Sequence, residues 1–545
     1  QSILKIHPND NVIVALRNLK KGETVQCNGE TFLLQEDVPA KHKLTTHALH
    51  EGDGVYMYGV LVGKAKHNID AACAITTENT FHAADAYRLR ERNTQWHAPD
   101  VSRWRNKTFM GFHRSDGSVG TANHWLVVPL VFCENRNVQV LREALLEELG
   151  YARPKKYHSL VKQLHHAFAN GEDVNEIDVA IKDDEVTATK LFNNVDGIKF
   201  LLHDGGCGGT RQDAEALCGL LAGYITHANV AGATVLSLGC QHSQVSILMD
   251  EIKKRSPQFD KPLFVIEQQQ VGLEKDVLAI AIKKTFEGLI KANECKRMPA
   301  PLSKLCIGLE CGGSDGFSGI SANPAIGYTS DLLVALGGTV LLSEFPELCG
   351  VEQELSDRCI DENVANRFMQ LMTTYNNRAK AVGSGFDMNP SPGNIKDGLI
   401  TDAIKSAGAA KKGGTSPVTA VLDYPEKATQ PGLNLLCTPG NDVESTTAEV
   451  GSGCNIVLFT TGLGTPTGNP IAPVIKLSTN TALYNKMPDI IDINTGAIID
   501  GDETIEQAGE RILEYVIKVA SGEEVCAAVR HGQDDFIVWK RGVSL

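Results

Sequence analysis

Six short apolar segments of this chain turn polar at their ends, and this repeated change constrains the fold more than any other feature. Runs rich in leucine and β-branched residues are typical of parallel strands that are buried on both faces of a sheet. The segments are KFLLHDGGCGGTRQD (199–213), TVLSLGCQHSQ (234–244), PLFVIEQQQ (262–270), GTVLLSEFPE (338–347), LNLLCTPGND (433–442) and NIVLFTTGLGTPTGNP (455–470). Because open α/β sheets bind ligands outside the carboxyl ends of their strands, the pattern predicts one wide polar site along such an edge.

The loop GLECGGSDGFSGISANP (308–324) is the most distinctive strand end. It follows the apolar run 305–307 and precedes a helix-like segment near Asp331. Glycine lets the backbone approach a ligand without a Cβ in the way, and polar or thiol side chains in such a loop have little packing role. We therefore expect a ligand or metal site here rather than an ordinary surface loop. The side chains concerned are Glu310, Cys311, Ser314, Asp315 and Ser318.

Composition narrows the class of protein. The formal net charge of −14 argues against a nucleic-acid partner, because phosphate binding favours a basic surface. We find no apolar stretch of membrane-spanning length and no secretory signal pattern, so we expect no membrane partner. The 14 cysteines are scattered rather than densely spaced, which indicates reduced thiols and a cytoplasmic location.

Three units follow from the changes in pattern along the chain. Residues 1–92 alternate apolar and polar positions, as in LKIHPNDNVIVAL (4–16), and predict a small all-β module. Residues 93–108 are expected to form a linker. Alternating strands and helices then fill 109–295 and, after a proline-containing break, the C-terminal catalytic unit 296–545. The predicted fold class is therefore α/β, with two units of mostly parallel sheet after an N-terminal β module.

Several polar residues allow two interpretations. His203 suits a general base or a metal ligand, and the alternative is a histidine that caps the turn after a strand. Cys207, Cys240 and Cys311 could ligate iron or an iron–sulfur cluster, but no C-x-x-C pair joins them, so a shared site must form by folding. A divalent metal with mixed ligands is the competing interpretation. The loops GGTRQD and GLGTPTG match neither nucleotide-binding fingerprint, which argues against a nucleotide ligand.

Five motifs lie in order along nearly the whole chain: FHRSDGSVGTAN (112–123), GLECGGSDGFSGISANP (308–324), NPSPGN (389–394), TPGND (438–442) and TTGLGTP (460–466). They resemble the motifs of the altronate/galactarate dehydratase family of sugar-acid dehydratases. The N-terminal module likewise resembles the small β-clip domain, called SAF, that precedes the catalytic part in this family. Two positions depart from the family pattern, since Leu463 and Thr467 occupy a loop that usually carries arginine and tyrosine.

The resemblance implies dehydration of an aldonate such as D-altronate to 2-keto-3-deoxy-D-gluconate, with ferrous iron (Fe2+) as the usual cofactor. A divalent metal would act as a Lewis acid on the substrate, while a base removes the C2 proton and an acid protonates the departing 3-hydroxyl. We expect the catalytic groups to be His203, Asp315 and Glu344. The expected metal ligands are Cys207, Cys240 and Asp442, and Asp315 and Glu344 are further candidates. The substrate-binding candidates are Arg114, Asn123, Ser314, Ser318, Asn394 and Asn441.

Other functions stay open on the sequence alone. The same family pattern serves galactarate (aldarate) dehydration and sulfolactate-type lyases. A nicotinamide-dependent oxidoreductase would also place glycine loops at strand ends, but the chain lacks the dinucleotide fingerprint. A binding protein without catalysis would need fewer reactive side chains at its strand ends. We expect a small-molecule sugar acid as the partner, and a homo-oligomer is compatible with the sequence.

Overall fold

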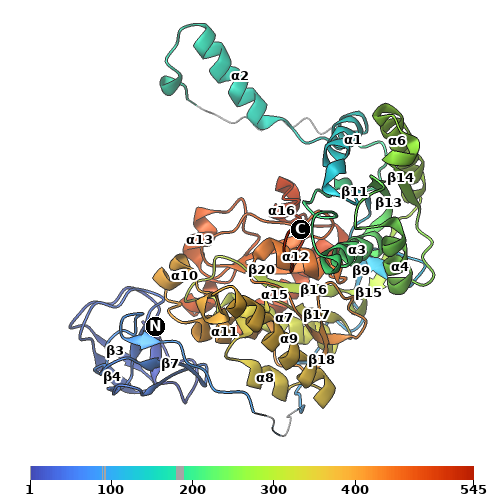
Figure 1. Ribbon diagram of the computed structural model, residues 1–545. Helices are drawn as coiled ribbons and strands as arrows, with labels where there is room; N and C mark the ends of the chain where they lie inside the picture. Colours follow the sequence, from blue (N-terminus) through green and yellow to red (C-terminus); the bar gives the residue numbers. More distant parts are fainter. Residues whose placement is uncertain (1, 89, 91–93, 179–188) are drawn as a thin grey trace.

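The computed structural model describes residues 2–88, 90, 94–178 and 189–545. An N-terminal β module is followed by two α/β units, here called the middle unit and the C-terminal unit, each built around a parallel sheet (Figure 1). The fold class predicted from the sequence is therefore confirmed. The predicted boundary between residues 92 and 93 falls outside the described residues.

The β module folds from short antiparallel strands. They are β1 (Ile3–Leu4), β2 (Val12–Ala15), β3 (Thr24–Cys27), β4 (Glu30–Leu33), β5 (Lys43–Thr45), β6 (Gly54–Met57), β7 (Val60–Ala65) and β8 (Thr80–Phe81). In β3 the side chains of Val25 and Cys27 are buried while their neighbours are exposed, as alternation on a one-sided strand requires. The module therefore has a small core of its own, formed by residues such as Ile13, Leu34 and Leu44.

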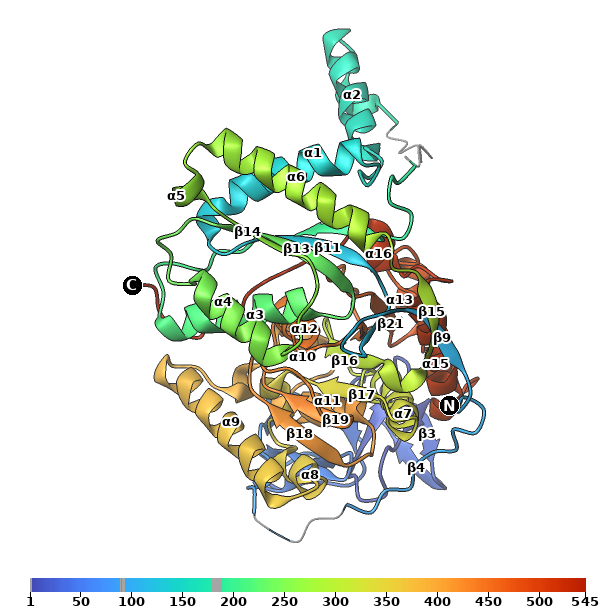
Figure 2. The ribbon, with the colours of Figure 1, turned by 90° about the vertical axis from the view of Figure 1, so that its right-hand side faces the viewer.

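The middle unit has a four-stranded parallel sheet in the order β12-β11-β13-β14. Its elements are β11 (His124–Pro129), β12 (Gly197–Phe200), β13 (Val230–Ser237), β14 (Leu263–Glu267), α1 (Asn135–Glu148), α2 (Lys156–Ala169), α3 (Arg211–Thr226), α4 (Val245–Arg255), α5 (Gln268–Val271) and α6 (Glu274–Ala292). Helices α1 and α6 cover one face and α3 and α4 the other, so β11 and β13 are buried on both sides (Figure 2). Helix α2 projects away from the rest of the molecule (Figure 1).

The C-terminal unit has a seven-stranded sheet, parallel throughout, in the order β18-β19-β17-β16-β20-β21-β22. The strands are β16 (Cys306–Cys311), β17 (Thr339–Leu342), β18 (Val418–Leu422), β19 (Gly432–Leu436), β20 (Ile456–Thr461), β21 (Val474–Ser478) and β22 (Ile493–Asn494). The helices are α7 (Ala322–Ala335), α8 (Glu352–Asp357), α9 (Glu362–Ala381), α10 (Pro392–Lys396), α11 (Asp402–Ala409), α12 (Asp442–Gly451), α13 (Thr481–Lys486), α14 (Ala497–Asp500), α15 (Ile505–Ser521) and α16 (Ala527–His531). Strand β20 is buried along its whole length and β16 along all but its first residue, as expected for central strands of a parallel sheet.

A three-stranded antiparallel sheet joins the two α/β units. It consists of β10 (Val119–Gly120), β9 (Thr108–His113) and β15 (Arg297–Pro301) in that order. Strand β9 precedes the middle unit in the chain and β15 follows it, and β9 also packs against α15. The chain therefore enters and leaves the middle unit at one place.

The polar strand ends of the sequence are divided between two sheets. Within each sheet the strands run parallel, so their carboxyl ends meet along one edge. The single wide edge expected from the sequence is thus two edges, one on the middle sheet and one on the C-terminal sheet. Within the described residues, no helix combines the length and apolar character needed to cross a membrane.

Candidate active site

A thiol and two acidic side chains meet at the carboxyl edge of the C-terminal sheet. Strand β16 ends at Cys311, and Glu344 and Glu347 follow the neighbouring strand β17. The Cys311 thiol donates to Glu347 Oε2 at 3.2 Å and lies 3.5 Å from Glu344 Oε2. All three side chains are buried, and their candidate ligand atoms lie within 4.8 Å of one another.

Two buried lysines complete this group. Lys405 on α11 contacts Glu347 Oε1 at 2.6 Å. Lys412, just after α11, contacts Glu344 Oε2 at 2.5 Å and Cys311 Sγ at 2.9 Å. Buried charges are tolerated only when they are paired and hydrogen-bonded, which these contacts achieve. We call Cys311, Glu344, Glu347, Lys405 and Lys412 the acid–lysine cluster.

The backbone at Glu344 is strained. Its φ of 62° and ψ of 58° place it in the left-handed region, which residues other than glycine rarely adopt. Its amide donates to Thr438 Oγ1 at 2.8 Å, and its carboxylate accepts from the Cys311 amide at 3.2 Å. These contacts join the ends of β16, β17 and β19 and fix the Glu344 side chain at the edge. Strain of this kind concentrates at functional sites.

Burial and mutual charge effects set protonation within the cluster. Burial raises the pKa of Glu344, and the charge of Glu347 raises it further. Burial acts in the same direction on Glu347, but attraction from Lys405 and Lys412 outweighs it and lowers the pKa of that carboxyl. For Lys412, burial opposes the charged form, yet Cys311 and Glu344 hold its pKa well above the ordinary value. At neutral pH, Glu347 is therefore an anion that faces protonated lysines.

Two further buried carboxyls, Glu310 and Glu449, lie behind the cluster, and burial favours the neutral form of each. Burial raises the pKa of Glu449 to about 8. Burial and repulsion from Glu344 raise the pKa of Glu310 well above its ordinary value. Glu449 Oε1 accepts from the Leu309 amide at 3.0 Å and from Ser343 Oγ at 2.6 Å. Glu449 thereby supports the ends of β16 and β17 through hydrogen bonds.

Glycines and one acidic side chain form the rim above the cluster. A Cβ on Gly312 would lie 2.0 Å from Asp442 Oδ2, so only glycine fits there. A Cβ on Gly440 would lie 3.6 Å from Glu347 Oε1, which places this glycine directly over the cluster. Burial raises the pKa of Asp442 to about 7, with repulsion from Glu344 and Glu347 adding to it. Asp442 is half-buried, so the rim carries a carboxyl that titrates near neutral pH.

Asp315 lies at the contact between the C-terminal unit and the β module. Its buried carboxylate lies 3.0 Å from Lys41 Nζ and accepts from Thr479 Oγ1 at 3.0 Å. Lys43 is also buried, donates to the Gly398 carbonyl at 2.6 Å, and has its pKa lowered to about 7 by burial. The β module therefore packs directly against the loops that follow β16.

Seven of the residues predicted from the sequence lie along this edge. Asn394 donates to the Ser314 carbonyl at 2.8 Å, and Ser318 Oγ lies 3.2 Å from Asp315 Oδ1. Asn441 caps the amino end of α12, directly before Asp442. The seven are Ser314, Asp315, Ser318, Glu344, Asn394, Asn441 and Asp442.

The other predicted catalytic and metal-binding residues lie on the middle sheet. His203 and Cys207 follow β12, and Cys240 follows β13, whereas Asp442 lies on the C-terminal unit. The structure therefore does not gather Cys207, Cys240 and Asp442 into one ligand set. Both ring nitrogens of His203 contact backbone, Nε2 with the Pro129 carbonyl at 2.8 Å and Nδ1 with the amide two residues further on at 3.2 Å. Its position matches the turn-capping alternative.

Arg114 and Asn123 contact backbone where the units join. Arg114 Nε donates to the Ala228 carbonyl at 2.7 Å, and Arg114 Nη2 donates to Asn123 Oδ1 at 2.9 Å. Asn123 Nδ2 in turn donates to the Asn194 carbonyl at 2.7 Å. Both side chains thus hold the entry to β11 and are not part of the acid–lysine cluster.

Sequence reasoning missed the two lysines of the cluster. Lys405 and Lys412 lie in TDAIKSAGAAKKGG (401–414), whose small residues give no sign of a charged site. A lysine on the apolar side of a short helix was the available signal at Lys405. Nothing local distinguishes buried Lys412 from Lys411, its partly exposed neighbour.

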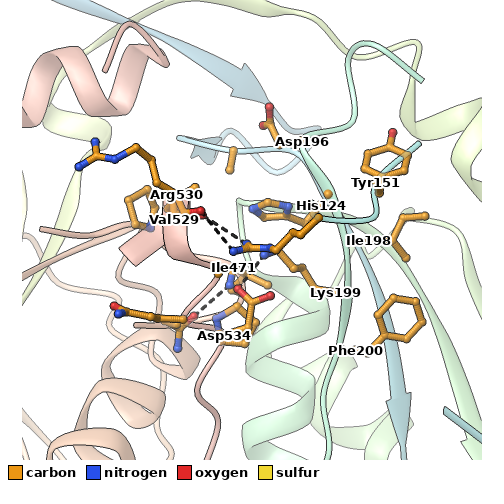
Figure 3. A pocket seen from close by; sticks show the side chains of 18 of the residues that line it. His124, Tyr151, Asp196, Ile198, Lys199, Phe200, Ile471, Val529, Arg530 and Asp534 are labelled. Atoms are coloured by element: carbon orange, nitrogen blue, oxygen red, sulfur yellow. Dashed lines mark hydrogen bonds and ion pairs between the residues drawn. The ribbon is translucent and has the colours of Figure 1, made fainter. Parts of the chain in front are cut away.

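A cavity of about 1400 Å³ lies elsewhere, between the middle and C-terminal units (Figure 3). It adjoins His124 and Gly197, the first residues of β11 and β12, so it lies at the amino ends of the middle sheet. Lys199 in its wall contacts Asp534 at 2.8 Å. Because open α/β sheets carry out chemistry at the opposite ends of their strands, we place the active site at the acid–lysine cluster.

Comparison with known proteins adds independent evidence. Family models match three consecutive parts of the chain: the altronate/galactarate dehydratase SAF domain at 1–82, the D-galactarate dehydratase/altronate hydrolase second domain at 111–293, and the D-galactarate/altronate dehydratase C-terminal domain at 302–544. An altronate dehydratase of Bacillus subtilis is 34% identical over 100% of both chains. An altronate dehydratase of Escherichia coli is 32% identical over 99% of both chains. A galactarate dehydratase (L-threo-forming) of Escherichia coli is 31% identical over 96% of this chain and 93% of its own. The chain therefore belongs to the altronate/galactarate dehydratase family and is an enzyme, a hydro-lyase of the altronate dehydratase type.

Proposed function

We propose that this enzyme removes water from an aldonate, D-altronate, to form 2-keto-3-deoxy-D-gluconate, with the help of a divalent cation. The acid–lysine cluster and the rim above it carry the proposal. Together they place two lysines, acidic side chains and Asp442, whose pKa is raised to about 7, at one edge of the sheet. The names of the two altronate dehydratases that match over the full chain support the choice of sugar acid.

Dehydration of a sugar acid needs three kinds of group. A base removes the proton from C2, an acid gives a proton to the 3-hydroxyl as it leaves, and positive charge stabilises the enediolate formed between these events. The resulting enol becomes the 2-keto acid by taking up a proton at C3. Lys405 and Lys412 supply fixed positive charge at the floor of the site. Asp442 is the candidate for proton transfer, since its pKa of about 7 suits either direction.

The donor set of the cluster fits a divalent cation. Cys311, Glu344 and Glu347 offer a thiol, which would lose its proton on binding a cation, and two carboxyl groups, a mixed set compatible with Fe2+. Among the residues that the structure describes, none forms a hydrogen bond with buried Glu344 Oε1, which leaves this oxygen available as a ligand atom. When bound, such an ion would supply Lewis acidity toward the substrate carboxylate and 2-hydroxyl. Lys412 Nζ contacts Cys311 Sγ and Glu344 Oε2, which are two of the candidate ligand atoms. The lysine ammonium group and a cation would therefore compete for these atoms.

The rim favours an aldonate over an aldarate. Leu463 follows β20, lies close to Gly393 across the rim and is 37% exposed. An aldarate carries a second carboxylate, which this apolar side chain cannot pair. An aldonate ends in a hydroxymethyl group, which needs no such partner.

A substrate panel tests this proposal. Under anaerobic conditions with added Fe2+, we expect keto acid to form from D-altronate at a kcat/KM well above that for galactarate, with no sulfite released from sulfolactate. Chelation of the metal should abolish turnover. A higher kcat/KM for galactarate or sulfolactate would contradict the choice of substrate, and full activity in chelator would contradict the cation.

The pH dependence of the reaction tests the role of Asp442. Because its carboxylate form is the base, kcat/KM should fall about tenfold per pH unit below pH 7 as Asp442 takes up a proton. Asp442→Asn should lower the rate and remove this fall of kcat/KM at acidic pH, the acidic limb of the pH–rate profile. Glu444→Gln, in the same first turn of α12, is the matched control and should keep the limb. An unchanged acidic limb in Asp442→Asn would assign the base to another residue.

A further inference from the structure

The exposed cysteines of this protein all occur at one place. Of the 14 cysteines, all within the described residues, only Cys133, Cys207 and Cys240 are exposed. They follow β11, β12 and β13 respectively, so all three lie at the carboxyl edge of the middle sheet. Free cysteine is among the most buried residue types, so three exposed thiols along one edge call for a reason other than packing.

Backbone contacts hold the three cysteine loops together. The Phe132 amide, next to Cys133, donates to the Gly205 carbonyl at 3.1 Å. The His242 amide, near Cys240, donates to the carbonyl of Gly206, the residue before Cys207, at 2.9 Å. Ser243 Oγ donates to the carbonyls of Leu130 and Gly206. The loops therefore form one connected layer rather than three independent surface turns.

Two glycines make this close approach possible. Gly206 has a φ of 103°, and a Cβ there would lie 2.6 Å from the Leu130 carbonyl oxygen. Gly239 has a φ of 127°, and a Cβ there would lie 2.5 Å from Gln269 Oε1. A side chain at Gly206 would push apart the loops that carry Cys133 and Cys207, and one at Gly239 would displace Gln269, which contacts Cys240.

The surroundings of the thiols suit thiolates. Gln269 Nε2 lies 3.2 Å from Cys240 Sγ and can donate to it. Helices α1, α3 and α4 all begin at this edge, at Asn135, Arg211 and Val245. The positive amino end of a helix stabilises nearby negative charge, including that of a cysteine thiolate.

The spacing of the thiols argues against a single ion held by all three. A single ion with thiolate bonds of about 2.3 Å needs its sulfurs within about 4 Å of one another. The sulfurs of Cys133, Cys207 and Cys240 do not all lie within 4.8 Å of one another. An iron–sulfur cluster places several irons between its thiolates and accepts a wider spacing.

We propose that Cys133, Cys207 and Cys240 hold an iron–sulfur cluster with three cysteine ligands. The fourth iron of a [4Fe–4S] cluster then takes a ligand from solvent or from a bound small molecule. The site is separate from the acid–lysine cluster and does not depend on the proposed substrate. Burial raises the pKa of Glu444 on α12, and the charge of Asp204, which follows β12, raises it further.

The test is to purify the protein anaerobically, reconstitute it with ferrous iron and sulfide, and measure iron, acid-labile sulfide, visible absorption and the electron paramagnetic resonance spectrum. We expect roughly four sulfide per chain, and roughly four iron beyond the single Fe2+ proposed at the acid–lysine cluster. Cys133→Ser, Cys207→Ser and Cys240→Ser should each lose most of the sulfide and the visible absorption. Cys73→Ser and Cys295→Ser, at half-buried thiols outside this edge, are the matched controls and should keep both. Circular dichroism should show that every variant is folded.

Two results would overturn the cluster. One is iron without sulfide in the wild-type protein, and the other is an undiminished cluster in folded Cys207→Ser. Dehydration is measured separately on the same samples. Glu347→Gln should lose turnover but keep the cluster, so failure of the proposed reaction and failure of the cluster give different results.

Discussion

Glu347→Gln should lower kcat for dehydration by about 100- to 10,000-fold while the protein stays folded. Glutamine has the shape of glutamate and can still accept from Lys405, but it carries no charge. The anion that faces the cluster lysines at neutral pH is thereby lost. The substitution also replaces the Glu347 carboxylate, one of the three candidate cation ligands, with an amide that binds cations more weakly. Initial rates of keto-acid formation measure the effect, and metal analysis shows whether the cation is lost at the same time.

Glu449→Gln is the matched control for that variant. Glu449 is equally buried and lies behind the same strands, but its pKa of about 8 means that it is already largely neutral at pH 7. The amide should therefore replace the carboxylic acid with a change of less than about threefold in kcat. Equal losses in both variants would show that the region tolerates no substitution, and a wild-type rate in Glu347→Gln would remove Glu347 from the reaction.

Lys412→Met should destabilise the C-terminal unit by about 3 kcal/mol at pH 7. The lysine pairs with Glu344 and Cys311 where no solvent can replace it. Breaking a buried pair costs about 3–5 kcal/mol, and the lower end applies because Glu344 can take up a proton once the ammonium is gone. The destabilisation caused by Lys412→Met should therefore become smaller as the pH falls, because Glu344 is then protonated in the wild-type protein as well. Hydrogen exchange of the β16 and β17 amides in the native state measures this difference for the unit concerned.

Lys411→Met supplies the comparison. Lys411 is the adjacent residue, is about one-third exposed, and lies 3.9 Å from the similarly exposed Glu354. Its replacement should change the stability by no more than about 0.5 kcal/mol. If Lys412→Met exchanged as slowly as Lys411→Met, the ion pairs within the cluster would contribute no net stability.

The fold could be predicted from the sequence because its signals are local. Apolar runs such as the IVLF of β20 indicate strands buried on both faces, and alternation indicates the β module. The division into two sheets could not be predicted, since no local signal states which strands are neighbours. The polar ends were therefore treated as one edge, although those of β12 and β13 belong to a different sheet from those of β17 and β19.

The candidate site shows the same distinction between signals in the local sequence and contacts that only folding creates. Glu344 and Asp442 could be predicted because each lies in a polar segment that follows an apolar strand. Lys405 and Lys412 come from the chain around α11, and only folding reveals that they pair with residues after β17. His203 also follows a strand, but its ring contacts the Pro129 carbonyl on the adjacent strand. Nothing in the sequence around His203 indicates this long-range hydrogen bond.

A structure of Glu347→Gln with D-altronate bound would test the position of the active site most directly. The acid–lysine cluster predicts that the sugar acid lies at the rim formed by Gly312, Gly440 and Asp442, with its carboxylate end toward Lys405 and Lys412. Density for the sugar acid in the cavity beside His124 and Lys199, with an empty rim, would contradict this assignment.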